Sequence, residues 1–194
     1  MRIIGLCGRS GSGKGTFCQI AQENGFKVID CDVVYKTLVS EITPCLLEIA
    51  KHFGEDAINN NSLNRRYLAP IVFSSPQKLN LLNSITHKYI KEEINNIISN
   101  LPSNANVIID APTLFESGID KDCHIIVGVI ADNNLCIDRI TERDNITKEE
   151  AEKRLSNQIS NEKIAQKSNF LLYNNGSLTD LEKASAQLIK SLSE

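Results

Sequence analysis

The sequence predicts an α/β fold in which a mostly parallel central sheet lies between two layers of helices. Three observations support this prediction: short apolar runs alternate with helical patterns, a glycine-rich turn follows the first apolar run directly, and several apolar runs end in an aspartate. Strands that alternate with helices favour parallel pairing, because each crossover helix packs on a face of the sheet. With 194 residues, 41% of them apolar, the chain can bury the core of one such domain.

The N-terminal half alternates apolar runs with helical patterns that glycine, proline and asparagine separate. Thr43-Pro44 and Ser75-Pro76 each place a capping hydroxyl before a proline at a first helical position. The stretch 63–101 has helical signals and no convincing strand, so it predicts a helical insertion between the second and third strands. The expected elements are a strand at 3–7, a helix at 14–24, a strand at 26–29, a helix from Thr43-Pro44 to before Gly54, a turn at 59–61 and helices over 63–101.

The C-terminal half continues the alternation. Thr147 and Glu150 have the spacing of a capping box, and Ser177 is placed to cap a terminal helix. The apolar runs suit the interior of a parallel sheet. The expected elements are a strand at 107–112, a strand at 125–130, a helix at 132–143, a charged helix after the capping box, a strand at 170–173, a turn at 174–176 and a terminal helix.

The segment Gly8–Thr16, which reads GRSGSGKGT, predicts a phosphate-binding loop between the first strand and the first helix. Glycines allow consecutive backbone N–H groups to surround a polyphosphate, and the helix that follows directs its positive end at the same anion. Lys14 supplies a mobile positive charge for the outer phosphates. Gly15 occupies the position where a hydroxyl usually binds Mg²⁺, so Thr16 is the next hydroxyl available.

Asp30, Asp32 and Asp110 fall at the C-terminal ends of predicted strands, at the edge where the loop places its phosphates. Phosphoryl transfer needs carboxylates at this edge. We expect Asp32, just past its strand, to orient or deprotonate an acceptor hydroxyl, and Asp110 to hold Mg²⁺ directly or through water together with Thr16. The alternative for each aspartate is a cap or turn, and this alternative is favoured for Asp30.

Two pairs of side chains have helical spacing in the charged C-terminal region. Arg139 and Arg143 are four residues apart, as are Arg154 and Gln158, so each pair is expected to share a helix face. Guanidinium groups on such faces can close over phosphates and neutralise the charge of the transferred group. The alternative is a solvated, salt-bridged surface, because acidic residues are neighbours: Glu142, Glu149, Glu150 and Glu152.

Other candidates carry weaker signals. His87 lies in the helical insertion, where it either contacts a substrate or makes a structural hydrogen bond. Arg65 and Arg66 face either an anionic acceptor or solvent. Leu114 and Phe115 form either an apolar wall for a substrate or part of the core.

Composition excludes some classes of function. A net charge of −3 and an isoelectric point near 5.7 argue against a dedicated nucleic-acid binder. The six cysteines have no Cys-x-x-Cys spacing, so they are expected to be reduced thiols. With no predicted signal sequence and no apolar run of membrane-spanning length, we expect a soluble cytoplasmic protein that does not bind membranes.

Several separated segments, taken in order, resemble the dephospho-coenzyme A kinases, a family of P-loop small-molecule kinases. The resemblance covers nearly the whole chain, and the order and spacing of the segments make it specific. The segments are Gly8–Thr16, Val28–Asp32, Thr43-Pro44 through His52–Gly54, Ser62–Arg66 through Ile71–Ser74, Leu82-Asn83 to His87, Ile109–Glu116, Arg143-Asp144 through Arg154 to Gln158, and Asn175–Ser177.

The resemblance implies that the γ-phosphoryl group of ATP is transferred to the 3′-hydroxyl of dephospho-coenzyme A, with Mg²⁺. It implies these nucleotide contacts: phosphates on Gly11, Ser12, Gly13, Lys14, Gly15 and Thr16, and adenine near Asn175 and Gly176. The implied catalytic residues are Lys14, Asp32, Arg139 and Arg143. The implied acceptor-binding residues are Asp32, His87, Leu114 and Phe115.

The resemblance also implies one P-loop kinase domain over residues 1–194, as a monomer or weak homo-oligomer. Its parts would be a core at 1–58, 105–138 and 168–194, an acceptor-binding helical insertion at about 59–104 and a lid at about 139–167.

Two alternatives to this function stay open. The Gly-Lys-Gly-Thr loop is similar to that of cytidylate-type nucleoside monophosphate kinases, although the Asp110-x-Pro112-x-Leu114-Phe115-Glu116 segment argues against them. A non-catalytic ATP-binding switch is the second alternative.

Overall fold

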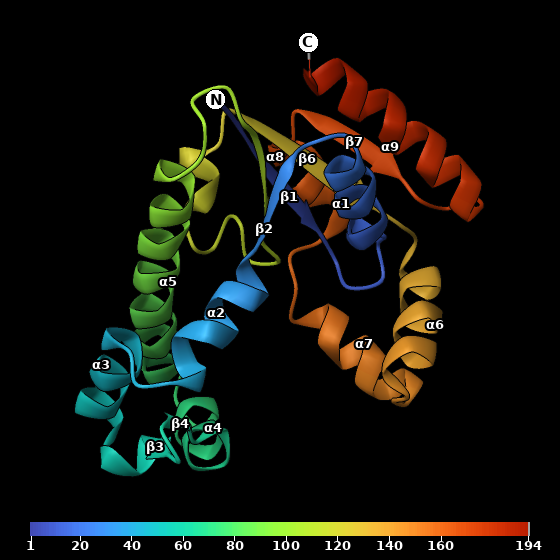
Figure 1. Ribbon diagram of the computed structural model, residues 1–194. Helices are drawn as coiled ribbons and strands as arrows, with labels where there is room; N and C mark the ends of the chain where they lie inside the picture. Colours follow the sequence, from blue (N-terminus) through green and yellow to red (C-terminus); the bar gives the residue numbers. More distant parts are fainter. Residues whose placement is uncertain (194) are drawn as a thin grey trace. The chain divides into compact units, whose positions relative to one another are not determined.

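The computed structural model describes residues 1–193, which form two compact units (Figure 1). The sheet unit consists of Met1–Ile29 and the chain from Pro102 onward, and the helical unit consists of Asp30–Leu101. The two units are described separately below.

The sheet unit is built on five strands in the order β2-β5-β1-β6-β7. β1 pairs in parallel with β5 and β6, and β6 pairs in parallel with β7, so these strands end at one edge of the sheet. This arrangement confirms the predicted parallel sheet. The elements are β1 (Arg2–Gly8), α1 (Lys14–Glu23), β2 (Lys27–Asp30), β5 (Asn106–Asp110), η2 (Ile119–Asp122), β6 (Ile125–Ile130), α6 (Asn133–Asp144), α7 (Lys148–Ser156), α8 (Asn161–Lys167), β7 (Phe170–Tyr173) and α9 (Leu178–Ser193).

The side chains of β1 alternate between two helical layers. Ile4 and Leu6 are fully buried in one core with Phe17 of α1 and with apolar residues of α9. On the opposite face, a Cβ added to Gly5 would lie 2.9 Å from the Leu114 side chain, so a larger residue there would displace this buried leucine. Because alternate residues of a strand point to opposite faces, one strand serves both layers, and the three-layer α/β prediction is confirmed.

The helical unit begins with two helices that side chains cap, Asp30 at the first and Thr43 at the second. The Thr43 hydroxyl accepts a hydrogen bond from the Leu46 N–H at 3.1 Å, as its position before Pro44 predicted. The predicted turn at 59–61 is confirmed as a hairpin in which Asn60 and Asn61 adopt positive φ angles. The elements are α2 (Cys31–Ser40), α3 (Pro44–Phe53), η1 (Glu55–Ala57), β3 (Ile58–Asn59), β4 (Ser62–Leu63), α4 (Arg65–Phe73) and α5 (Pro76–Ser99).

The helical unit has its own hydrophobic core and starts at residue 30 instead of about residue 59. α2 and α3, which the sequence analysis assigned to the sheet core, pack against α5. Val39 of α2 and Ile49 of α3 are buried with Ile85 of α5. This packing depends on contacts between segments far apart in the sequence, which local patterns do not reveal.

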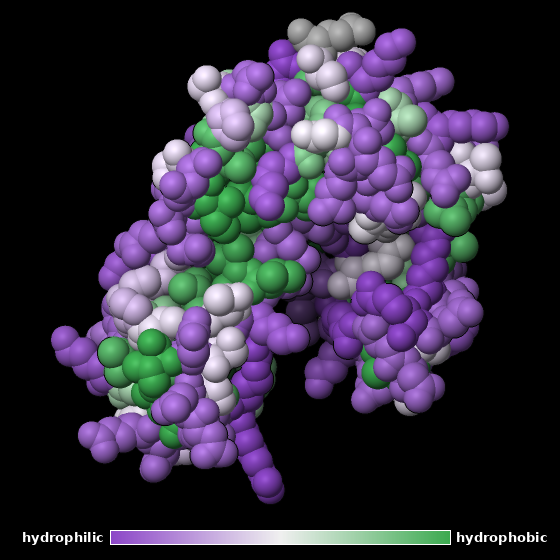
Figure 2. All heavy atoms as spheres, in the orientation of Figure 1, coloured by the Kyte–Doolittle hydropathy of each residue, from purple (hydrophilic) through white to green (hydrophobic). Residues whose placement is uncertain are grey.

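The surface differs between elements. Figure 2 shows apolar atoms over α2 and α3 and mainly hydrophilic atoms over α6 and α7. Val33 of α2 and Leu47 of α3 are about half exposed, as is Ile42 between the two helices. The six cysteines are free thiols, in agreement with their spacing. Among residues 1–193, no helix has the length and apolar character needed to cross a membrane.

Candidate active site

The loop between β1 and α1 needs glycine at two positions. Gly11 has φ 76° and Gly13 has φ 105°, both in the left-handed region that side chains disfavour. A Cβ on Gly11 would lie 2.7 Å from the Cys136 carbonyl oxygen, and a Cβ on Gly13 would lie 2.4 Å from the Asn174 amide nitrogen. The loop is therefore packed closely against the residues that surround it.

The carbonyl groups of the loop are held by side chains. The ammonium of Lys14 donates to the Gly8 carbonyl at 3.0 Å, and Nη1 of Arg139 donates to the Gly11 carbonyl at 3.2 Å. Nδ2 of Asn174 donates to the Ser12 carbonyl at 2.8 Å. With these carbonyls engaged, the groups that remain to meet an anion are N–H donors, including those of Lys14 and Gly15 at the start of α1, whereas the Thr16 N–H already donates to the Gly13 carbonyl at 3.2 Å.

Asn174 is a site residue that the sequence analysis missed. It follows β7, is only 6% exposed, and accepts bonds from Arg139 at its main-chain carbonyl and its side-chain oxygen. The predicted residue Asn175 instead exchanges two 2.8 Å hydrogen bonds with Asp132, and Gly176 lies against Asp180. A polar residue directly after a buried strand is the sequence signal that could have pointed to Asn174.

The arginines of α6 and α7 have different partners. Arg139 contacts the loop, whereas Arg143 donates two hydrogen bonds to Asp144, at 2.7 and 3.0 Å. Arg154 also pairs with Asp144. Hydrogen bonds from Arg143 and then Arg154 hold the pKa of Asp144 far below its usual range.

The expectation that Arg154 and Gln158 share one helix face is wrong, because α7 ends at Ser156. Gln158 lies beyond the helix and contacts the phosphate-binding loop. Its Oε1 accepts from the Ser10 N–H at 3.0 Å, and its Nε2 donates to the Ser10 hydroxyl at 2.9 Å. Residue spacing alone did not show where the helix ends.

Asp110 is the last residue of β5, beside Leu6 of β1 in the sheet register. The Cys18 thiol of α1 donates to Oδ2 of Asp110 at 3.7 Å. Thr16 is about 160° from Cys18 around α1 at about 100° per residue, and it lines a groove against α9 with Gln19 and Glu182. The structure therefore does not place Thr16 beside Asp110.

The residues on this edge still suit Mg²⁺. Nowhere in residues 1–193 do three His, Cys, Asp or Glu side chains gather as a metal site. Mg²⁺ in phosphoryl-transfer sites usually keeps several waters and binds one or two carboxylates together with the substrate phosphates. The carboxylate of Asp110, on the same edge as Lys14, has the chemistry that such a ligand needs.

Asp32 lies in the helical unit, in the first turn of α2, and its side chain is exposed. Asp30 caps this helix by accepting from the N–H groups of Asp32, at 2.8 Å, and Val33, at 3.2 Å. The capping interpretation of Asp30 is therefore confirmed, and the cap fixes the turn that carries Asp32.

An apolar groove of about 260 Å³ lies in the helical unit near this turn. Tyr35 lines it and is about 60° from Asp32 around α2. The Arg65 guanidinium lies over the Tyr35 ring, 5.4 Å from its centre, and burial raises the pKa of Tyr35. Phe73, 78% exposed, also lines the groove. The remaining lining residues are Leu63, Leu68, Ala69, Val72, Leu79 and Leu82.

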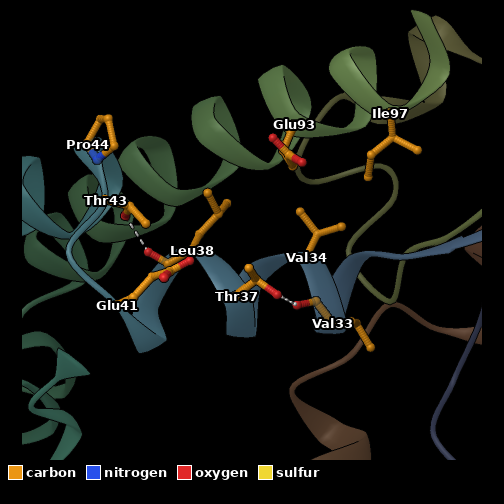
Figure 3. A pocket seen from close by; sticks show the side chains of 9 residues that line it. All are labelled: Val33, Val34, Thr37, Leu38, Glu41, Thr43, Pro44, Glu93 and Ile97. Carbon is orange, nitrogen blue, oxygen red and sulfur yellow. Dashed lines mark hydrogen bonds between the residues drawn. The ribbon is translucent and has the colours of Figure 1, made fainter. Parts of the chain in front are cut away.

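A second groove, of about 450 Å³, lies between α2, the start of α3 and α5 (Figure 3). Its wall includes Val33, Thr37, Glu41 and Glu93. Thr37 is about 140° from Asp32 around α2, so this groove opens on another face of the helix. Two carboxylates in its wall make it unsuitable for an anionic ligand.

The other predicted acceptor residues have varied settings. His87 is half-buried on α5 and lines neither groove of the helical unit. In the sheet unit, Leu114 is fully buried against Gly5, so the core-packing alternative describes it. Phe115 is partly exposed, and the ammonium of Lys167 lies 4.7 Å from its ring centre.

A glycine loop with engaged carbonyls, at the C-terminal edge of a parallel sheet and beside a strand-end carboxylate, defines a P-loop phosphotransferase of the small-molecule kinase class. The model of the dephospho-CoA kinase family matches residues 2–180. The chain belongs to this family.

Individual relatives agree with the family match. The dephospho-CoA kinase of Fusobacterium nucleatum is 40% identical over 186 residues, with 93% of both chains covered. The structure of dephospho-CoA kinase from Campylobacter jejuni has a TM-score of 0.75 at 26% identity, covering 100% of this chain and 98% of that chain. The structure of TT1252 from Thermus thermophilus has a TM-score of 0.82 at 29% identity, covering 98% and 97%.

Proposed function

We propose that this protein transfers the γ-phosphoryl group of ATP to the 3′-hydroxyl of dephospho-coenzyme A, giving coenzyme A and ADP. The observation that carries this proposal is the loop of residues 8–15, whose carbonyls are engaged by Lys14, Arg139 and Asn174, in a chain of this family. Such a loop offers N–H donors and a helix N-terminus to the phosphates of ATP.

Four residues of the loop, together with Arg139 of α6, have definite tasks in this proposal. The N–H groups of Gly11, Gly13 and Gly15 bind phosphate oxygens, and Lys14 exchanges the Gly8 carbonyl for the outer phosphates. Arg139 binds the Gly11 carbonyl and so keeps this carbonyl from pointing at the phosphates. Mg²⁺, when bound by Asp110 and the phosphates, would neutralise charge on the transferred group.

The acceptor requires a base and a binding surface. Asp32 accepts the proton of the attacking hydroxyl, and its exposed carboxylate can approach a substrate. The groove next to Tyr35 suits the rest of dephospho-coenzyme A, because Arg65 can pair with its diphosphate while apolar side chains, including Phe73, cover its uncharged pantetheine arm. His87 lies outside the groove and is not required in this arrangement.

Arg143 and Arg154 complete the proposed site. Both guanidiniums meet at Asp144, so this cluster carries a net positive charge that a phosphate can share. We extend the proposal to a monomer or weak homo-oligomer that works in the cytoplasm. The six free thiols support the cytoplasmic location.

The test is to mix the purified protein with ATP, Mg²⁺ and either dephospho-coenzyme A or CMP, and to measure ADP release and product mass. We expect phosphorylated product from dephospho-coenzyme A alone. Formation of CDP would favour a cytidylate-type kinase, and tight ATP binding without turnover of either acceptor would favour a nucleotide-dependent switch.

Two variants test the role of the base. Asp32→Asn should lower kcat by a factor of about 100 or more while the Kd for ATP changes little, in the range expected for loss of a general base. Asp30→Asn is the matched control, because asparagine caps a helix as well as aspartate does. Equal turnover of the Asp32 variant and the wild type would remove Asp32 from this role.

A further inference from the structure

Arg9, in the first half of the phosphate-binding loop, is a buried cation with two neutral acceptors. It is 9% exposed, its Nη1 donates to Oδ1 of Asn133, and its Nη2 donates to the Leu155 carbonyl at 2.6 Å. Its Nε is buried and has no hydrogen-bond partner in the part of the chain that the structure describes. Exposed Glu162, in the first turn of α8, is near enough for the Arg9 charge to contribute to the lowering of its pKa, after hydrogen bonds at Ser160 and at its own backbone, and no ion pair joins the two among the described residues. Burying a cation is costly, and a solvent-screened carboxylate compensates this charge only in part.

The two acceptors of Arg9 come from different helices. Asn133 is the first residue of α6, and Leu155 is in the last turn of α7, where the helix dipole presents its negative end. A guanidinium can reach both because its donors form a rigid fork, whereas a lysine ammonium is a single point. Arg9 thus joins the loop to α6 and α7 at once.

The next residue of the loop is fastened to the same region. Ser10 is bonded to Gln158, two residues beyond the end of α7, through its N–H and its hydroxyl. Two consecutive loop residues are therefore attached to the end of α7, while Arg139 and Asn174 hold the carbonyls of Gly11 and Ser12. The first half of the loop is also held from within, because Lys14 donates to the Gly8 carbonyl and the Ser12 N–H donates to the Arg9 carbonyl, but Arg9 and Ser10 are its links to α6 and to the end of α7.

We propose that Arg9 is a positioning residue for ATP: it fixes the first half of the loop against α6 and α7, and its buried charge strengthens the binding of the polyphosphate. This inference rests on the proposed binding of ATP to the loop. It requires no contact between Arg9 and the nucleotide, because a charge in a poorly solvated site acts on phosphates over several ångströms. Gln158 serves the same positioning without adding charge.

The test uses calorimetric titration of the protein with ATP, ADP and AMP. Because the effect of a fixed charge grows with ligand charge, Arg9→Met should weaken ATP binding by about tenfold or more, ADP binding less, and AMP binding by less than about twofold. Gln158→Ala should weaken ATP binding less than Arg9→Met does. Because Gln158 adds no charge, its loss should weaken ATP and ADP binding by the same factor. Arg9→Lys, which keeps the charge but not the fork, should fall between the wild type and Arg9→Met.

Arg2→Met is the matched control. Arg2 also donates to a carbonyl near the end of a helix, that of Leu192 in α9, but it lies at the start of β1. We expect this variant to lower Tm to a degree comparable with Arg9→Met and to leave ATP binding unchanged. The proposal is overturned if Arg9→Met and Arg2→Met bind ATP equally well, or if Arg9→Met weakens AMP and ATP binding by the same factor.

These titrations do not depend on the acceptor. If dephospho-coenzyme A is not phosphorylated by the wild type but the graded loss of nucleotide binding is observed, the proposed function fails and the role of Arg9 stands. If the wild type phosphorylates dephospho-coenzyme A but Arg9→Met weakens the binding of ATP, ADP and AMP equally, the proposed function stands and the role of Arg9 fails.

Discussion

Replacing Gly15 by serine should add a metal ligand to this protein. A Cβ at Gly15 would meet nothing within 4 Å, and Gly15 is not among the residues with positive φ, so a side chain fits without strain. Position 15 is about 60° from Cys18 around α1, and Cys18 contacts Asp110. A serine hydroxyl there would lie near the side of α1 that faces Asp110 of β5, the candidate metal ligand, unlike the hydroxyl of Thr16.

Replacing Gly15 has two separate effects, one on the stability of the helix and one on the affinity for the metal ion. In a helix, serine is better than glycine by about 0.5 kcal/mol and alanine by about 1 kcal/mol, so Tm should rise by about 1–2 °C and 2–4 °C respectively. An oxygen ligand that replaces a metal-bound water should be worth on the order of 1.4 kcal/mol, which is tenfold in the metal Kd. Gly15→Ala therefore separates helix stability from metal binding.

The assay is a Mn²⁺ titration of the protein with saturating ATP, in which the electron paramagnetic resonance signal of free Mn²⁺ is measured. Gly15→Ser should bind the ion about tenfold more tightly than the wild type, and Gly15→Ala should match the wild type. A parallel Mg²⁺ dependence of ADP release should shift in the same direction. The reasoning is refuted if the serine and alanine variants bind Mn²⁺ equally, since the hydroxyl would then not reach the ion.

Three further outcomes are expected. Phe73→Ala should raise the KM for dephospho-coenzyme A by about fivefold to tenfold and leave the KM for ATP unchanged, because ATP has no pantetheine arm; equal effects on both KM values would place the arm elsewhere. Asp144→Asn should lower kcat with little change in Tm, because Arg143 and Arg154 lose their shared partner in an exposed network; unchanged kcat would remove the pair from the reaction. Burial raises the pKa of Cys7 from 9.0 to about 11, so the folded state keeps a proton that the unfolded state loses. Urea melts should show stability falling by up to about 1.4 kcal/mol per pH unit between pH 9 and 11, and Cys7→Ala should reduce that slope.

The sequence predicted those parts of the fold that depend on neighbouring residues. The caps at Thr43 and Ser75 and the capping box from Thr147 to Glu150 are present, because each joins residues three apart in the chain. The start of the helical unit at residue 30 was missed, since it depends on α2 and α3 packing against α5. Hydrophobic periodicity shows that a helix has a buried face and does not show which element covers it.

In the candidate site, too, the features that depend on neighbouring residues were predicted and those that depend on distant contacts were not. The loop and its glycines were predicted from a contiguous motif, whereas its anchors, Arg139, Asn174 and Gln158, come from distant parts of the chain. Arg139 had been expected on a phosphate-closing face with Arg143, and Gln158 had been expected on a helix. Long polar side chains can find partners in several directions, so only tertiary structure decides which carbonyl or amide they meet.

The attachments to the loop also change how the predicted lid should be understood. The segment 139–167 was expected to close over phosphates, yet Arg139 near its start bonds the Gly11 carbonyl, and Gln158 bonds Ser10. A rigid opening of the whole segment would break these bonds and Arg9's bond to the end of α7 together. The corner between α6 and α7, where Asp144 joins Arg143 and Arg154, carries no such bond to the loop among the described residues. Because one carboxylate connects the two arginines, any adjustment to the phosphates at this corner has to move them as a pair.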